Sequence, residues 1–353
     1  MAKAKKIEGL SCETSAADNV RLILDGRLGE MCEWRAAALT DADGVHDMRV
    51  ASRRLRNALQ DFKPYLRWRK LAPAARELKR IARALGAVRD EDVAIAALEE
   101  LQLDALAADA AGIALLADER RRERDSARAV LVAAIAEETL AGWREEFAVA
   151  LEKALKPGRR PSKKKRLAAA LSFGEVAPEV VRARVAELRA LSASLYQPFA
   201  VEALHKTRIA ARRLRYAMQL LASCLNETLS ERAAEVAELQ TELGKLHDCD
   251  VWLEALGRML SELRADENQY RLPLNGTAGQ KQRAAVWLLC HFARARMKSY
   301  GQALALWQEW ETGDFFKRLA DSLDATAATR ESSPVAGAAA EAGAFDCAGR
   351  EPS

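Results

Sequence analysis

Residues 46–58 read His-Asp-Met-Arg-Val-Ala-Ser-Arg-Arg-Leu-Arg-Asn-Ala, and residues 205–217 read His-Lys-Thr-Arg-Ile-Ala-Ala-Arg-Arg-Leu-Arg-Tyr-Ala. The two segments share eight of thirteen residues at a constant offset of 159. A duplicated core segment would repeat mainly apolar residues, whereas this duplication also repeats a histidine and four arginines. The repeated cations indicate a doubled basic surface whose partner is a polyanion.

Both segments have the periodicity of an amphipathic helix. At about 100° per residue, the histidine and three of its arginines share an arc of roughly 80°, and apolar residues lie on the opposite face. Like charges one turn apart destabilise a helix, and neither arc contains a glutamate that would relieve the repulsion. A bound anion is therefore expected to neutralise them. The predicted anion-binding residues are His46, Arg49, Arg53, Arg56, His205, Arg208, Arg212 and Arg215, with secondary binding by Arg54, Arg213, Arg76, Lys79, Arg80 and Arg83.

Composition predicts an all-α protein with a local basic region. Alanine, leucine, glutamate and arginine dominate, while β-branched and aromatic residues are sparse. The net charge is only +4, but residues 46–90 contain thirteen Lys/Arg and four Asp/Glu, an excess of +9. A basic sector on a nearly balanced chain indicates local anion binding.

The six cysteines are scattered without a Cys-x-x-Cys pair, which is typical of a reducing compartment. No apolar run approaches the length needed to span a bilayer, and no signal-peptide core follows the first residues. The sequence therefore predicts a cytoplasmic protein without a membrane partner.

The repeat divides the chain into two similar halves. Short connections between amphipathic helices predict antiparallel neighbours, so each half is expected to be a four-helix bundle. The first helix is expected at about 17–38. Proline, glycine and seven cations at 156–166 cannot form a packed core, and they predict a flexible linker. The expected divisions are a flexible N-terminal arm at 1–15, a first repeat at about 16–152, a basic linker at about 153–174, a second repeat at about 175–312 and a disordered tail at 324–353.

A second phrase also recurs. Residues 85–93 read Leu-Gly-Ala-Val-Arg-Asp-Glu-Asp-Val, and residues 243–251 read Leu-Gly-Lys-Leu-His-Asp-Cys-Asp-Val. A glycine inside a helix costs about 1 kcal/mol relative to alanine, so its recurrence indicates close helix packing or a bend. The carboxylates are interpreted as structural supports that tether the arginines of the neighbouring helix. These supporting residues are Asp90, Asp92, Asp248 and Asp250.

The two phrases and their tandem order resemble the CHAD domain, the conserved histidine α-helical domain, over roughly residues 16–312. The resemblance implies two tandem four-helix bundles that form a shared basic cleft or pore and bind inorganic polyphosphate. It also implies association with polyphosphate granules. Some members are fused to a CYTH triphosphatase, whose Glu-x-Glu-x-Lys signature is not found here. The expectation is a stand-alone, non-catalytic member that needs no metal or cofactor.

The chain departs from a symmetric pattern in one respect. The basic face around Arg76 and Lys79 has no equally basic counterpart in the second half, where Glu235, Glu238 and Glu242 dominate. The resemblance therefore does not imply that the two halves contribute equally to anion binding.

Two other functional classes use similar residues. A nucleic-acid-binding protein also needs basic helices, but the arcs lack interleaved aromatic residues, and there is no helix-turn-helix or zinc signature. A metal-dependent phosphohydrolase is suggested by the dipeptides His46-Asp47 and His247-Asp248. These dipeptides occupy non-equivalent positions of the repeat, which argues against a duplicated metal centre.

Overall fold

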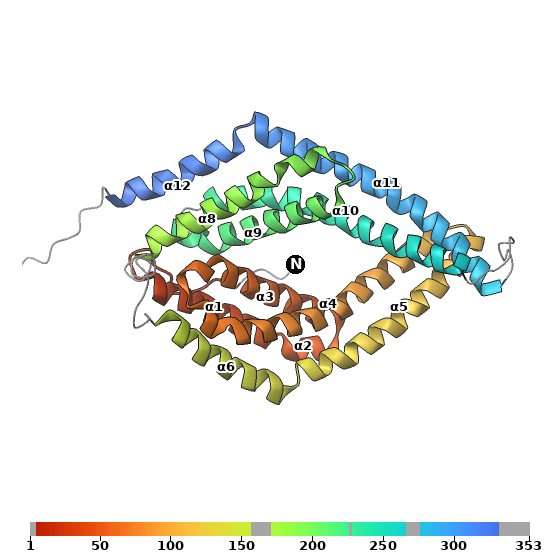
Figure 1. The fold of residues 1–353 in the computed structure, drawn as a ribbon, viewed down its shortest axis with the longest axis horizontal. Helices are drawn as coiled ribbons and strands as arrows, with labels where there is room; N and C mark the ends of the chain where they lie inside the picture. The colour runs from red at the N-terminus through yellow and green to blue at the C-terminus, as the bar shows by residue number, and fades with distance from the viewer. Residues whose placement is uncertain (1–4, 157–170, 226–227, 266–275, 332–353) are drawn as a thin grey trace, which may run out of the picture.

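The computed structural model describes residues 5–156, 171–225, 228–265 and 276–331, and Figure 1 shows that they are almost entirely helical. The described residues form no strand, only one isolated bridge between Ser15 and Ser172. The all-α prediction is confirmed. No described helix is both long and apolar enough to cross a membrane. The helices are α1 (Ala16–Glu33), α2 (Arg35–Thr40), α3 (Ala42–Asp61), η1 (Lys63–Tyr65), α4 (Trp68–Asp104), α5 (Ala107–Ala134), α6 (Glu137–Leu155), α8 (Phe173–Ala190), η2 (Ser192–Tyr196), α9 (Val201–Leu225), α10 (Thr228–Ala265), α11 (Gly276–Thr312) and α12 (Phe315–Glu331).

Local capping sets the start of α3, which with α9 carries the repeated histidines and arginines; we call α3 and α9 the His/Arg helices. The helix expected at about 17–38 is interrupted at Trp34 and continues as the short α2. The Asp41 side chain then accepts a hydrogen bond of 2.6 Å from the Gly44 backbone N–H, satisfying one of the unpaired donors at the start of α3. Pro64 lies in the 3-10 turn that follows α3. His46 is thereby placed in the second turn of α3.

The two halves repeat the same order of helix contacts. In the first half, α1 packs on α3, α3 on α4 and α4 on α5, and in the second half α8 packs on α9, α9 on α10 and α10 on α11. The halves also touch, through α3 with α9, α1 with α8 and α5 with α11 (Figure 1). The helices that carry the repeated histidines, α3 and α9, are therefore neighbours.

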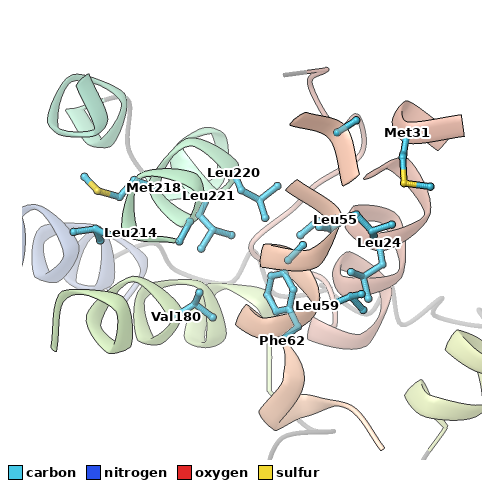
Figure 2. Close-up of a cluster of buried hydrophobic side chains, with 14 of the residues drawn as sticks. Leu24, Met31, Leu55, Leu59, Phe62, Val180, Leu214, Met218, Leu220 and Leu221 are labelled. Atoms are coloured by element: carbon cyan, nitrogen blue, oxygen red, sulfur yellow. The ribbon is translucent and has the colours of Figure 1, made fainter. Parts of the chain in front are cut away.

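The hydrophobic core is shared between the halves. The larger buried cluster joins Leu55 of α3 and Phe62, which follows α3, to Leu214 and Leu221 of α9, as Figure 2 shows. A second cluster joins α4 and α5 to α10 and α11, with members such as Ile113. The apolar contacts continue from one half into the other, and the finer prediction that each half is a four-helix bundle stays a prediction.

A glycine permits the contact between α5 and α11. A Cβ atom at Gly112 would lie 2.1 Å from the Gln280 carbonyl oxygen, far inside van der Waals contact. Gly112 therefore lets the two backbones approach and brings the second hydrophobic cluster together.

Two of the predicted chain segments differ from the structure. The arm expected to be flexible at 1–15 makes contacts over residues 5–15: Ile7 and Leu10 pack against the core, and the Cys12 thiol donates to the Cys224 carbonyl at 2.7 Å. Apolar residues at 7 and 10 give this arm a surface to bury. The tail expected from residue 324 is helical as far as Glu331. Residues 332–353, and residues 157–170 of the expected linker, lie outside the described residues.

Candidate anion-binding cavity

A cavity of about 1040 Å³ lies between α3, α4, α9 and α10, and we call it the basic cavity. Arg53 of α3 and Arg212 of α9 both line it, so the two repeated helices present arginines to one space. The charged and histidine residues that line it are His46, Arg49, Arg53, Arg56, Arg76, Lys79, Arg89, Asp90, Glu91, Arg120, His205, Arg208, Arg212, Arg213, His247 and Asp248.

The basic cavity holds far more positive than negative charge. Ten arginines and lysines line it against three carboxylates, an excess of +7 with the histidines neutral. Three of the ten cations are ion-paired: Arg49 with Asp90, Arg120 with Glu91 and Arg213 with Glu187. The other seven pair with no carboxylate in the described part of the chain, namely Arg53, Arg56, Arg76, Lys79, Arg89, Arg208 and Arg212.

The environment of these arginines disfavours their charge. Burial, together with the neighbouring guanidinium groups of Arg53 and Arg208, lowers the pKa of Arg212 to about 9. Burial likewise lowers the pKa of Arg208 and of Arg56. The Arg212 Nε atom is buried and has no hydrogen-bond partner. An anion in the cavity would supply this missing partner and offset the mutual repulsion.

The histidines of the cavity are held in the neutral form. Burial, followed by the charge of Arg89, lowers the pKa of His46. Burial and the guanidinium of Arg208 lower the pKa of His205, and they lower that of His247 to about 4. The Nδ1 atoms of His205 and His247 lie 3.1 Å apart, so one ring donates and the other accepts. An empty cavity therefore contains neutral imidazoles at pH 7.

The two repeated phrases meet at the cavity wall in both halves. A Cβ atom at Gly86 would meet the Arg49 Nε atom at 3.9 Å, and a Cβ atom at Gly244 would meet the Arg208 Nε atom at the same distance. The expected close helix packing at these glycines is wrong, because no backbone of a neighbouring helix lies within 4 Å of either position. The glycines instead leave room in which an arginine side chain lies across the helix.

The first aspartate of each second phrase lies beside that arginine. Asp90 accepts a hydrogen bond of 2.8 Å from Arg49, as predicted for a structural support. Asp248 lines the cavity near Arg208, and no hydrogen bond joins the two side chains in the described structure. Burial raises the pKa of Asp248, and the charge of Arg208 opposes this. Of these two aspartates, Asp90 alone forms an ion pair with the neighbouring arginine among the described residues, and the supporting role stays a prediction.

The second aspartate of each phrase faces a different arginine. Asp250 pairs at 2.5 Å with the buried Arg296 of α11, which also donates to the Pro198 carbonyl at 2.7 Å. In the first half, Arg128 of α5 donates to the Leu39 carbonyl at 2.5 Å. Burial raises the pKa of Asp92, and the charges of Arg124, Arg89 and, least of the three, Arg128 oppose this. Leu39 and Pro198 are separated by the repeat offset of 159. These contacts hold α5 and α11 against the segments that precede the His/Arg helices.

Arg54 and Arg213 lie at the edge of the two arginine-bearing helix faces, which we call the stripes. Each belongs to an ion-paired triad, and the two triads match. Glu30 of α1 pairs at 2.6 Å with both Arg27 and Arg54. Glu187 of α8 correspondingly pairs with Arg184 at 2.6 Å and with Arg213. The triads link α1 to α3 and α8 to α9. Sequence reasoning missed the glutamates, although Arg27-x-x-Glu30 and Arg184-x-x-Glu187 recur at an offset of 157.

Several predicted binding residues do not line the basic cavity. Arg215 is only 6% exposed, and its guanidinium lies over the Tyr216 ring, where the first half has Asn57. It stands at the edge of the predicted arc, so a small rotation of α9 is sufficient to turn it inward. The secondary residues Arg54, Arg80 and Arg83 are also absent from the lining: Arg54 pairs with Glu30, Arg80 pairs with Glu77, and Arg83 is exposed.

Other cavity residues were not predicted. Arg89 and His247 stand at the same position of the second phrase and come close to His46 and His205 respectively. Because an arginine and a histidine occupy this position in the two halves, the sequence comparison did not mark it as a shared site position. Arg120 reaches the cavity from α5, outside both phrases, and no sequence signal marks it.

Two tryptophans line the basic cavity, and each has a cation over its ring. Trp252 stacks on Phe292 at 4.9 Å between ring centroids, and the Arg120 guanidinium lies over the Trp252 ring at 5.6 Å. The Lys63 ammonium lies over Trp68 at 5.0 Å. A nucleic-acid base would have to displace these groups before it could stack. Among the described residues, moreover, no group of three or more His, Cys, Asp and Glu side chains is placed to hold a metal ion.

Comparisons with known proteins agree with this architecture. The family model described as "CHAD domain" matches residues 22–257. The crystal structure of the CHAD domain from the plant Ricinus communis is similar, with a TM-score of 0.63 and 21% identity over 86% of this chain and 97% of that one. PptA from Streptomyces chartreusis is also similar, with a TM-score of 0.61 and 15% identity over 84% of this chain and 100% of that one. No curated protein matches the sequence.

Proposed function

Because this chain belongs to the CHAD domain family, we propose that it binds inorganic polyphosphate in the basic cavity. The observation that carries the proposal is the set of seven cations, contributed by both halves, that line one cavity without a described carboxylate partner. Separate surface cations would be solvated and inexpensive, but Arg53, Arg89, Arg208 and Arg212 are half-buried in one cavity. Their arrangement is costly unless an anion with many charges occupies the cavity.

Polyphosphate fits the chemistry of these side chains. Each phosphate unit carries charge and exposes oxygens, and an arginine fork can contact two such oxygens while remaining ionised. The cavity offers arginines on α3 and α9 that face one another, so a linear anion between them would touch both repeats. A single phosphate would neutralise only part of the excess positive charge of the cavity.

The proposal is tested by competition between polyanions. Labelled polyphosphate bound to the full chain is displaced by unlabelled polyphosphate, single-stranded RNA or duplex DNA at one salt concentration. We expect polyphosphate to compete far better than either nucleic acid per phosphate, because Phe292 and Arg120 already contact the Trp252 ring on which a base would stack. If seven contacts form, the logarithm of affinity should fall with the logarithm of salt with a slope of about −5. Equal competition by RNA would support the nucleic-acid alternative.

We propose further that the protein is a non-catalytic binder that associates with polyphosphate granules in the cytoplasm. The described residues include no metal-binding group, and the cavity histidines pair with each other or lie beside arginines. Release of phosphate from polyphosphate, measured with and without added Mg²⁺ or Mn²⁺, separates binding from hydrolysis. Release that depends on the divalent ion and on His247 would contradict the proposal.

Binding is expected to strengthen as pH falls. His46, His205 and His247 have lowered pKa values in the empty cavity, so they are neutral at pH 7. A bound polyanion favours their protonated forms and raises these pKa values. Affinity should therefore change little between about pH 7 and 8 and rise below about pH 6.5, by up to about tenfold per pH unit for each proton taken up. The rise continues toward pH 4, where His247 titrates in the empty protein.

The contribution of the histidines is isolated by comparison with a His46→Gln, His205→Gln, His247→Gln variant over pH 5–8. Protonation of the polyphosphate ends affects both proteins equally and cancels. A slope in the variant as steep as in the wild type would show that these histidines are structural hydrogen-bonding groups.

A further inference from the structure

A second cavity, of about 620 Å³, adjoins the basic cavity at the turn between α3 and α4, and we call it the basic annex. Four of its eight lining residues are cations and none is acidic. The lining residues are Gln60, Lys63, Pro64, Leu66, Arg67, Trp68, Arg69 and Lys70.

The basic annex continues from the basic cavity. Gln60 at the end of α3 and Trp68 at the start of α4 line both spaces. A linear anion that leaves the basic cavity past these two residues would enter the annex without crossing an acidic group of either lining. The annex therefore extends the same charged path and is not a separate surface patch.

The cations of the annex have no evident role in holding the fold. Lys63, Arg69 and Lys70 are exposed, and none of the four cations forms an ion pair with a described carboxylate. Lys63 lies over the Trp68 ring, which leaves its charge available to an anion. A cluster of four like charges within eight residues repels itself, so the fold alone gives no reason for it.

The basic sequence of the annex occurs in one half only. At the repeat offset of 159, residues 63–70 correspond to residues 222–229, which read Ala-Ser-Cys-Leu-Asn-Glu-Thr-Leu and contain no cation. The neighbouring basic residues of α4, Arg76 and Lys79, likewise correspond to the acidic region of Glu235 and Glu238 in α10. The charged path is therefore directional, because it continues from the basic cavity along the first half.

We propose that the basic annex is a second polyphosphate subsite, occupied by chains long enough to extend out of the basic cavity past Gln60 and Trp68. It makes the protein selective for long chains, since a short chain is fully held in the basic cavity and gains nothing from the annex. This inference rests on the proposed function of the basic cavity. It adds the chain-length class of the ligand and the side of the molecule from which the chain emerges.

The test measures the affinities of two ligands, long-chain polyphosphate and tripolyphosphate, for the full-length protein. Arg69→Glu combined with Lys70→Glu reverses two exposed charges of the annex. The matched control is Arg294→Glu combined with Lys298→Glu, which reverses two exposed charges of α11 outside both cavities. We expect the annex variant to lose about tenfold in affinity for the long chain, with a salt slope less negative by about 1.4 for two lost contacts. Its affinity for tripolyphosphate should stay within about twofold of the wild type, as should both affinities of the control.

Each outcome separates this inference from the function on which it rests. A wild type that binds neither ligand would overturn the proposed function. In another outcome, the wild type binds both ligands while the annex variant loses affinity for both equally, or for neither. That result would overturn the proposed annex subsite and leave the proposed function standing. An equal loss in the α11 control would show that the effect is one of overall charge. Circular dichroism of both variants verifies that they are folded.

Discussion

Replacing Arg53 and Arg212 by glutamate is expected to abolish polyphosphate binding, with a loss on the order of a hundredfold or more in affinity at moderate salt. The two residues come from opposite halves and line the same cavity. The charge of Arg53 also lowers the pKa of Arg212, which shows that the two guanidinium groups share one electrostatic environment. The double change removes two contacts and adds two repulsive charges.

The fold is expected to survive this change. Neither arginine is ion-paired within the described residues, so glutamate leaves no buried partner without its counter-charge. The two new carboxylates would instead relieve repulsion among the remaining arginines. Affinity is measured by displacement of labelled polyphosphate, and helicity by circular dichroism. The Arg294→Glu, Lys298→Glu variant has the same change in net charge and should bind like the wild type. Normal binding by the Arg53→Glu, Arg212→Glu variant would show that these arginines lie on a solvated helix face and do not bind the anion.

Glu30→Ala is expected to lower the free energy of unfolding by about 3–5 kcal/mol, because it leaves buried charges without a partner. The Glu30 side chain is 2% exposed, and those of Arg27 and Arg54 are 7% and 12% exposed. Removing the carboxylate leaves two guanidinium groups side by side between α1 and α3. Glu30 is outside the basic cavity lining, so the folded fraction should still bind polyphosphate.

Chemical denaturation measures this loss, and the same helix supplies the control. Glu33 of α1 pairs with Lys5, but its side chain is 57% exposed, so Glu33→Ala should cost at most about 1 kcal/mol. A loss for Glu30→Ala no larger than that for Glu33→Ala would show that the triad does not brace α1 against α3. The matching change in the second half should cost less than Glu30→Ala, because Glu187 is more exposed.

Much of this protein could be predicted from its sequence. Helix type follows from residues within a few positions of one another, so the opposition of Leu55 to the arginine stripe of α3 could be predicted without any tertiary information. The repeat added long-range information, because two copies of one stripe imply a common partner. His46, Arg53, His205 and Arg212 line one cavity, and their role in binding stays a prediction.

The tertiary structure decided which edge residues reach the cavity. Arg56 lines it while its counterpart Arg215 is buried against Tyr216, although the two have the same position in the repeated phrase. Arg120 and Trp252 reach it from outside the predicted stripes. These differences depend on how far each helix is rotated against neighbours that are distant in sequence, and local periodicity does not contain that rotation.

Helix identity and the charge of each face were determined by the sequence alone, because both depend on contacts within one or two turns. The closing of α5 on α11 at Gly112, the shared hydrophobic clusters and the continuation of the basic cavity toward Lys70 were decided only by the folded chain. The physical reason is that a cavity is formed by surfaces from separate segments. Its shape therefore depends on the packing of those segments against one another, and not on the pattern within any one of them.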